Sequence, residues 1–301
     1  MRSFKSTSSL RDVNGIRPAY VEDQRSRCAP MRRGIAPTMY RMEFDKDQPA
    51  VGYERHGEVL VLALVKPEKL NAWDSGMRMR VGELLQEADA EPAVRAIVLT
   101  GTGERSFCAG ADLKELSRHR SPEQRVQQSM AEWRVFYSRI LNVGKPLIAA
   151  LNGLAAGSGF QVALMCDFRV GHDAVIMGQT EVLTGIPSIT GTTLMSRRLG
   201  AAVAGELALS GRMIDAEQAQ HLGLISRLVP QGKVLQEAIE LAREMGARST
   251  EAIRQTKRWL HQSELRDLDA AFDFAEKAQV AALTQGDMAE RIRAFANKRQ
   301  K

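Results

Sequence analysis

The chain has 301 residues, 44% of them hydrophobic, and carries 42 Lys and Arg against 36 Asp and Glu, a formal net charge of +6. This composition is that of a globular protein with a sizeable core, and no stretch approaches the roughly 18 uninterrupted apolar residues of a membrane-spanning helix. Positions 1–37 hold eight basic and three acidic residues, which leaves 34 and 33 elsewhere. The basic surplus therefore belongs to the tail, and we predict neither a nucleic-acid nor a membrane partner.

The N-terminal tail and the cysteines indicate the cellular compartment. Residues 1–37 show no helical or strand periodicity, so we expect a disordered basic tail. The first ten residues are polar rather than signal-like, and Cys28, Cys108 and Cys166 form no CxxC pair. We therefore expect a cytoplasmic protein without a disulfide framework. The five histidines form no HxxxH or HxH pair, so no metal site is predicted.

The ordered sequence begins near Tyr40 with a hairpin and a helix. Tyr53–Arg55 and Glu58–Val65 are predicted strands around the turn at His56 and Gly57. Asp74 or Ser75 caps a predicted helix that runs to about Ala90. The short apolar run Ala96–Thr100 has the length and composition of a buried strand. The order so far is β-β-α-β.

The same order then recurs, and helices follow. Asp112 and Glu115 are expected to cap a short helix, and Ser121 opens a long amphipathic one. The remaining predicted strands are Leu147–Leu151, Phe168–Gly171, Val175–Met177 and Ile225–Val229; the remaining predicted helices are Gly159–Met165, Ala216–His221 (capped by Asp215), Val234–Ala247, Thr250–His261, Leu268–Thr284 and Asp287–Lys298. We predict an α/β core over residues 38–233 and a helical C-terminal region over 234–301.

Two glycine-rich segments fail as nucleotide or nucleophile motifs. Gly101 and Gly103 follow a strand, but the third glycine of a dinucleotide fingerprint is replaced by Ser106. Gly157, Ser158 and Gly159 do not form a nucleophile elbow, because position 161 is Gln. Dinucleotide binding and serine-nucleophile hydrolysis are therefore not predicted.

Two small-residue turns remain, each after a predicted strand and before a predicted helix. They cover Phe107–Asp112 and Asn152–Gly159. Small side chains let a ligand carbonyl approach the main chain, and free N–H groups at a helix start carry partial positive charge. Together the two turns predict an oxyanion hole, whereas either alone is better explained as a tight turn with nothing bound.

Both turns, with their spacing, resemble the crotonase (enoyl-CoA hydratase/isomerase) superfamily. The resemblance covers about Tyr53 to Arg299. It rests on Lys66–Ala72, Ala96–Leu113, Lys145–Gly153, Ala155–Asp167, Gly178–Val182 with Gly185–Pro187, Arg197–Gly200, Ala216–Val229 and Ala294–Arg299. It implies a spiral of ββα turns, C-terminal helices that form a homotrimer or a dimer of trimers, and an acyl-CoA substrate. No cofactor is implied, because coenzyme A is part of the substrate.

The resemblance also implies roles for individual residues. The oxyanion donors are the backbone N–H groups of Ala111 and Ser158, the latter at a position where glycine is usual. The CoA path is lined by Lys66, Lys69, Leu70, Ala109, Gly110 and Gly157. Trp73, Met77, Met130, Trp133 and Phe136 belong either to the acyl pocket or to the core. Lys298 or Arg299 of a neighbouring subunit is a weaker candidate for a phosphate contact.

The two acid/base positions point to the reaction. Glu181 is retained, but the glutamate that hydratases carry in the helix after the second turn is Gln161 here, and Gln neither accepts nor delivers a proton at neutral pH. Isomerisation needs one carboxylate, which favours an isomerase; the family's commonest activity favours a hydratase. Both stay open. A CoA-thioester hydrolase and a thioester-binding protein without turnover are the alternatives.

Overall fold

Strands β1 (Val51–His56) and β2 (Val59–Leu64) form an antiparallel hairpin at the edge of the larger of two sheets. The structure is a computed structural model that describes residues 50–112, 121–286, 288, 290–292 and 294. All of them belong to one unit, Met42–Lys301. The predicted tail, 1–37, lies outside the described residues.

The larger sheet is parallel beyond its hairpin. Its strand order is β1-β2-β3-β5-β7-β10, and every neighbouring pair after β1-β2 is parallel. The added strands are β3 (Ala96–Gly101), β5 (Leu147–Ala150), β7 (Phe168–Gly171) and β10 (Arg227–Leu228). Their residues alternate between two apolar clusters, so this sheet is buried on both faces, as parallel sheets usually are.

A smaller sheet carries the site. Its order is β4-β6-β8-β9, with β4, β6 and β8 parallel and β9 antiparallel to β8. The strands are β4 (Ser106–Cys108), β6 (Leu154–Ala156), β8 (Ile176–Gly178) and β9 (Ile214–Asp215). β3, β5 and β7 each lead within a few residues into a strand of this sheet. Each of these three turns of the spiral therefore adds one strand to the smaller sheet, so that β4, β6 and β8 lie side by side.

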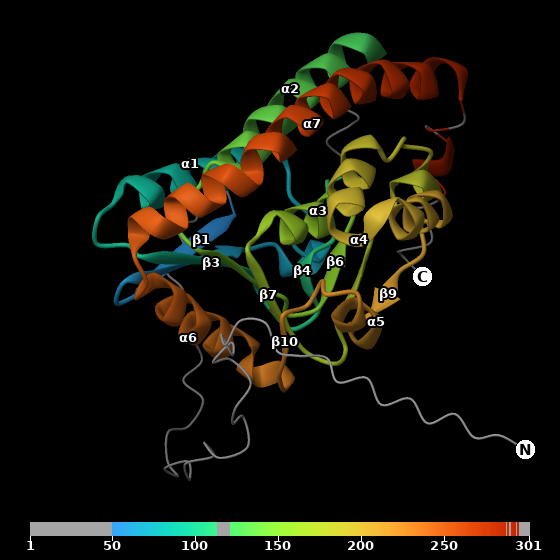
Figure 1. Cartoon of the computed structure of the whole chain (residues 1–301). Helices are drawn as coiled ribbons and strands as arrows, with labels where there is room; N and C mark the ends of the chain where they lie inside the picture. Colours follow the sequence, from blue (N-terminus) through green and yellow to red (C-terminus); the bar gives the residue numbers. More distant parts are fainter. Residues whose placement is uncertain (1–49, 113–120, 287, 289, 293, 295–301) are drawn as a thin grey trace, which may run out of the picture. The chain divides into compact units, whose positions relative to one another are not determined.

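Helices cover the two sheets. They are α1 (Ser75–Ala90), α2 (Pro122–Leu141), α3 (Ser158–Met165), α4 (Ile189–Ser210, kinked at Gly200), α5 (Ala216–His221), α6 (Val234–Gly246) and α7 (Thr250–Gln285), with 3-10 turns η1 (Pro67–Lys69), η3 (Glu181–Thr184) and η4 (Gln231–Lys233). α7 packs along α2 and α4, and Figure 1 shows α2 and α7 side by side. No helix among the described residues is long and apolar enough to cross a membrane.

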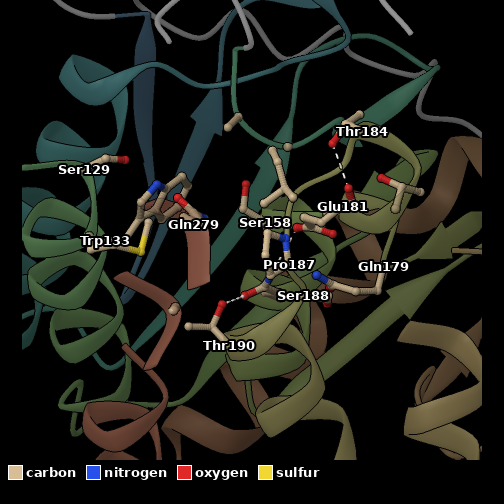
Figure 2. A pocket seen from close by; sticks show the side chains of 18 of the residues that line it. Ser129, Trp133, Ser158, Gln179, Glu181, Thr184, Pro187, Ser188, Thr190 and Gln279 are labelled. Atoms are coloured by element: carbon tan, nitrogen blue, oxygen red, sulfur yellow. Dashed lines mark hydrogen bonds between the residues drawn. The ribbon is translucent and has the colours of Figure 1, made fainter. Parts of the chain in front are cut away.

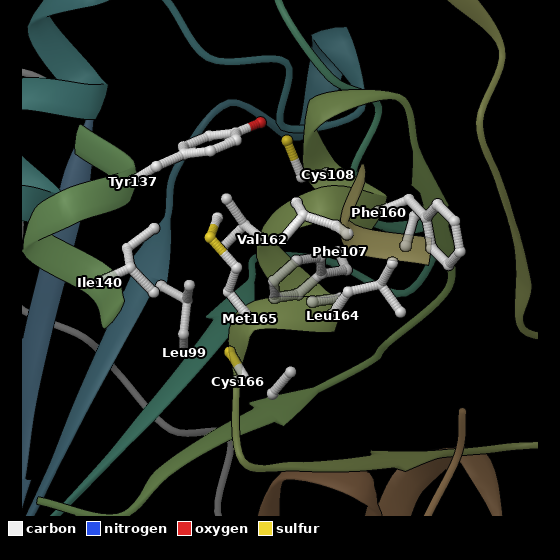
Figure 3. Packing of buried hydrophobic residues seen from close by; sticks show 14 of the residues in the cluster. Leu99, Phe107, Cys108, Tyr137, Ile140, Phe160, Val162, Leu164, Met165 and Cys166 are labelled. Atoms are coloured by element: carbon white, nitrogen blue, oxygen red, sulfur yellow. The ribbon is translucent and has the colours of Figure 1, made fainter. Parts of the chain in front are cut away.

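The larger apolar cluster lies between the sheets and α1 to α4. Leu99, Phe107, Phe160 and Met165 are almost fully excluded from solvent and pack together in Figure 3. The smaller cluster lies between the large sheet and α6, where strand residues such as Val61 meet helix residues such as Ile239. The larger sheet is thus packed on both faces, which fixes the strands that lead into the site.

The helix caps and the fold class are confirmed. Asp74 accepts from the N–H of Met77 at 3.0 Å, and Ser121 and Asp215 cap α2 and α5 in the same way. The mixed sheets followed by helices are the predicted α/β class. The Asp112–Glu115 cap lies outside the described residues, as does most of the predicted helix Asp287–Lys298.

Several predicted elements were wrong. The two predicted helices Thr250–His261 and Leu268–Thr284 are one helix, α7, because the connecting residues contain no Gly or Pro. α4 was not predicted, since Gly and Thr residues obscure its helical pattern. β6 and the last two residues of β4 lie inside segments interpreted as turns. The last strand is only Arg227–Leu228 rather than Ile225–Val229. The division at residue 233 stays a prediction.

Candidate active site

The pairing of β4 with β6 brings the two small-residue segments together. Ser106 pairs with Leu154 and Cys108 with Ala155, so the residues that follow the two strands emerge side by side. Gly110 has a φ of +95°, and a Cβ on it would lie 2.9 Å from the carbonyl oxygen of Ala156. The same Cβ would lie 3.6 Å from the backbone nitrogen of Ser158. A side chain at position 110 would fill the space between the segments, so glycine is needed there.

Among the described residues, two backbone N–H groups at this point have no acceptor. Trp73 donates its N–H to the carbonyl of Gly110 at 3.1 Å and accepts from the N–H of Asp112 at 2.9 Å. Successive peptide groups of an extended chain face opposite ways, so the N–H of Ala111 points away from Trp73. Ser158 is the first residue of α3, where N–H groups have no intrahelical acceptor. Within the described part of the chain neither N–H donates a hydrogen bond.

The side chain of Ser158 serves a structural contact. Its Oγ lies 3.0 Å from Nε1 of Trp73, and both residues are buried. The indole N–H therefore finds the partner that a buried donor requires. This bond ties the start of α3 to the segment that pairs with Ala111.

Glu181 begins η3, just after β8, and its carboxylate lies against the second turn. A Cβ on Gly157 would be 3.1 Å from Oε1 of Glu181. The residue as a whole is half-buried, but its carboxylate is enclosed, and Oε2 has no partner among the described residues. Burial raises the pKa of Glu181 to about 7, against the opposing effect of a hydrogen bond from Gln161.

Gln161 lies on α3 and joins three other side chains. Its Nε2 donates to Oε1 of Glu181 at 3.1 Å. Its Oε1 accepts from the hydroxyl of Tyr137 at 2.7 Å and from that of Thr190 at 2.9 Å. Tyr137 and Thr190 were missed from the sequence, since Tyr137 follows the apolar stripe of α2 and Thr190 lies in the unpredicted α4. No sequence signal marks either of them.

The donors and the carboxylate share a cavity of about 140 Å³. Its wall includes Ala109, Gly110, Ala111, Gly157, Ser158, Gln161 and Glu181. Figure 2 shows Trp133 and Ser129 on one side of it and Glu181 and Thr184 on the other. Met130 and Trp133 line it, whereas Trp73, Met77 and Phe136 are buried and absent from its wall. Of the five residues predicted to belong either to the acyl pocket or to the core, Met130 and Trp133 therefore line the cavity and the other three belong to the core.

Lys66, Lys69 and Leu70 flank the first turn rather than the cavity. The N–H of Ala109 donates to the carbonyl of Leu70 at 3.0 Å. Nζ of Lys69 lies 2.8 Å from Asp112, and Nζ of Lys66 lies 3.3 Å from the same carboxylate and 2.9 Å from Asp74. Both lysines are thus held by carboxylates beside the segment that follows β4 and contains Ala109.

The buried cysteines and the possible metal ligands add no chemistry to this site. Burial raises the pKa of Cys108 and of Cys166 to about 12, so both thiols stay protonated near neutral pH. Among the described residues, no group of three or more His, Cys, Asp or Glu side chains could hold a metal ion. The chemistry that this arrangement supports is proton transfer beside a carbonyl held by two amides.

The fold and cavity thus define an α/β protein in which a spiral of ββα turns brings two free amides to a buried carboxylate. Residues 54–301 match the family described as Enoyl-CoA hydratase/isomerase. A putative enoyl-CoA hydratase of Thermus thermophilus is 36% identical over 245 residues, which cover 81% of this chain and 96% of that protein. The short-chain-enoyl-CoA hydratase of Clostridium acetobutylicum is 32% identical over 82% of this chain and 94% of its own length.

A solved structure of a related protein has the same fold. A carnitinyl-CoA dehydratase from Mycobacterium avium superposes with a TM-score of 0.72 at 32% identity, over 82% of this chain and 97% of that one. The chain belongs to the enoyl-CoA hydratase/isomerase family, the crotonase superfamily. The family, the fold class and the enzyme class predicted from the sequence are confirmed.

Proposed function

We propose that the protein binds an acyl-CoA thioester, holds the thioester oxygen with the N–H groups of Ala111 and Ser158, and transfers a proton with Glu181. The observation that carries this proposal is the convergence of two unpaired amides and one enclosed carboxylate on a single cavity. Coenzyme A enters as part of the substrate, and no other cofactor is proposed. Lys66, Lys69 and Leu70 are proposed to lie along the CoA path together with Ala109, Gly110 and Gly157.

Typical energies support separate roles for the two amides and for the carboxylate. Removing a proton beside a thioester carbonyl creates an enolate, and loss of one oxyanion donor typically costs about 3–4 kcal/mol of transition-state stabilisation. A positioned carboxylate adds about 10²- to 10⁴-fold. The pKa of about 7 at Glu181 suits a group that must both take and return a proton near neutral pH.

The geometry at Gln161 favours double-bond isomerisation. Both lone pairs of its Oε1 are occupied by the hydroxyls of Tyr137 and Thr190, so it offers a water only N–H donors. Glu181 is then the single base: it removes a proton from C2 of a 3-enoyl-CoA and returns it to C4, which moves the double bond to C2–C3. Hydration is the second candidate, because the relatives of Thermus and Clostridium are named enoyl-CoA hydratases.

One absorbance assay separates the candidates. A 3-enoyl-CoA gains the absorbance of a conjugated enoyl thioester on isomerisation, and crotonyl-CoA loses it on hydration. Release of free CoA, read with a thiol reagent, would indicate a hydrolase; thioester binding by calorimetry with none of these changes would indicate a protein without turnover. Glu181→Gln is expected to abolish turnover and leave CoA affinity largely intact. Retained activity in this variant would remove Glu181 from the mechanism.

We also propose that the chain forms a homotrimer or a dimer of trimers. On α7 the predicted apolar residues divide: Leu268 and Phe272 are buried within the chain, whereas Trp259 and Phe274 remain 77% and 62% exposed. Large exposed apolar side chains of this kind favour an interface. Light scattering coupled to size exclusion measures the mass, and a monomer at micromolar concentration would contradict the proposal.

A further inference from the structure

Gln161 is held from two sides by hydroxyl groups that belong to different helices. We infer that Tyr137 and Thr190 are positioning residues that lock the amide of Gln161 as a hydrogen-bond donor toward Glu181, so that Oε1 is fixed and Oε2 carries the transferred proton. This inference rests on the proposed role of Glu181. Tyr137 comes from α2 and Thr190 from α4, and Figure 2 draws the Thr190 bond as a dashed line.

The orientation of the amide follows from the partners. An ionised carboxylate only accepts, so the side of Gln161 that faces Glu181 must be Nε2. Oε1 then faces Tyr137 and Thr190, and both hydroxyls must donate. Burial, and secondarily the negative charge of Glu181, raises the pKa of Tyr137 well above its usual value, so its phenol keeps the proton that it donates.

The flipped amide is the alternative, and the two hydroxyls oppose it. With Oε1 turned to a protonated Glu181, Nε2 would face two hydroxyl oxygens whose own hydrogens need other acceptors. In the described structure the only acceptor of either hydroxyl is Oε1 of Gln161. The buried hydroxyl of Tyr137 and the half-buried hydroxyl of Thr190 would each lose a hydrogen-bond acceptor, which is costly in an enclosed site. The hydroxyls therefore favour the donor orientation and the ionised form of Glu181.

The surroundings offer little competing charge. Of the described residues that line the cavity, only Tyr137 and Glu181 titrate. Cys108 of β4 and Arg78 of α1 act on Tyr137, and Arg291 packs against Gly185 behind η3. From α3 and α4 the carboxylate region is faced by the uncharged Gln161 and Thr190. The hydrogen bond from Gln161 is thus the main side-chain contact that favours the charged carboxylate.

The test uses a matched pair at position 190. Thr190→Val keeps the shape and removes the hydroxyl, whereas Thr190→Ser keeps the hydroxyl. Thr190→Val is expected to lower kcat about 2- to 10-fold at pH 6.5, where a weaker bond leaves more Glu181 protonated, and by less than about twofold at pH 9. KM should change little, and Thr190→Ser should retain the wild-type pH profile. A loss of equal size at both pH values would overturn the inference.

Tyr137→Phe is a second, independent variant with the same expected profile. If Tyr137 acts through Gln161, its removal should have no further effect on the pH profile in a Gln161→Leu background. An undiminished effect there would contradict the coupling.

A direct titration separates this inference from the proposed function. Carbon-13 NMR of chains labelled at the glutamate carboxyl follows Glu181, whose signal is identified by its absence in Glu181→Gln. The midpoint should move to higher pH in Thr190→Val and in Tyr137→Phe but not in Thr190→Ser. The result stands even if no enoyl-CoA is turned over. Identical midpoints in folded variants would refute the inference.

Discussion

The carboxylate of Glu181 lies directly against Gly157: a Cβ on that glycine would be 3.1 Å from Oε1 and 3.5 Å from the carboxyl carbon. Gly157 also has a φ of +56° and a ψ of −127°, a conformation that residues with a side chain avoid. The same residue therefore sets the start of α3, next to the Ser158 amide, and the position of the base. Donor and base are coupled through one backbone position.

Gly157→Ala should accordingly damage both stability and chemistry. The strained backbone costs of order 1–3 kcal/mol, and the added methyl displaces the carboxylate, for which we expect a loss in kcat of about 10²-fold. Gly223→Ala is the control, since Gly223 has a φ of +73° and open space around its Cβ position. That variant should lose stability without losing kcat. Thermal unfolding and initial rates below both melting temperatures check the pair, and equal kcat values would count against the geometry.

A proline at position 158 removes one oxyanion donor with little change to the helix. Ser158 is the first residue of α3, where proline is tolerated because its missing N–H has no helical acceptor. Ser158→Pro should reduce kcat/KM by about 10²- to 10³-fold relative to Ser158→Ala. The alanine variant controls for the lost bond from Trp73, which should cost about 1–3 kcal/mol of stability. Similar rates in the two variants would exclude this amide from the mechanism.

Gln161→Glu should shift the reaction toward hydration. The new carboxylate keeps the acceptors of Tyr137 and Thr190 and adds a second base beside Glu181, so a water can be held between two carboxylates. We expect hydration of crotonyl-CoA to rise at least about tenfold. Gln161→Leu, which has neither acid nor donor, should show no such gain. A rise in both variants, or in neither, would contradict the role assigned to the amide.

The stability of Glu181→Gln should depend on pH in a defined direction. Between the ordinary value of 4.5 and about 7, the folded chain keeps a proton on Glu181 that the unfolded chain has released, so wild-type stability falls as pH rises through this range. Removing the ionisable group abolishes this loss. The variant should stay within about 1 kcal/mol of the wild type at pH 5 and exceed it by up to about 3 kcal/mol at pH 8. Thermal melts at the two pH values measure this; an equal difference at both would argue against a raised pKa.

Elements with strong local signals, and the family, could be predicted from the amino-acid sequence alone. The hairpin around His56, the caps at Asp74 and Ser121 and the buried strand at Ala96 all depend on nearby residues, and the structure agrees. Family motifs also selected Ala111, Ser158 and Glu181, which the structure brings to one cavity.

How these residues come together depends on contacts between segments that are distant in the chain. β4 and β6 are too short to show a period of their own, and they form because each supplies the other's hydrogen bonds, which places Gly110 beside Ser158. Tyr137 and Thr190 reach Gln161 from helices far apart in the chain, so no local pattern could reveal them. The raised pKa of Glu181 likewise comes from burial, which depends on the packing of the whole site rather than on neighbouring residues.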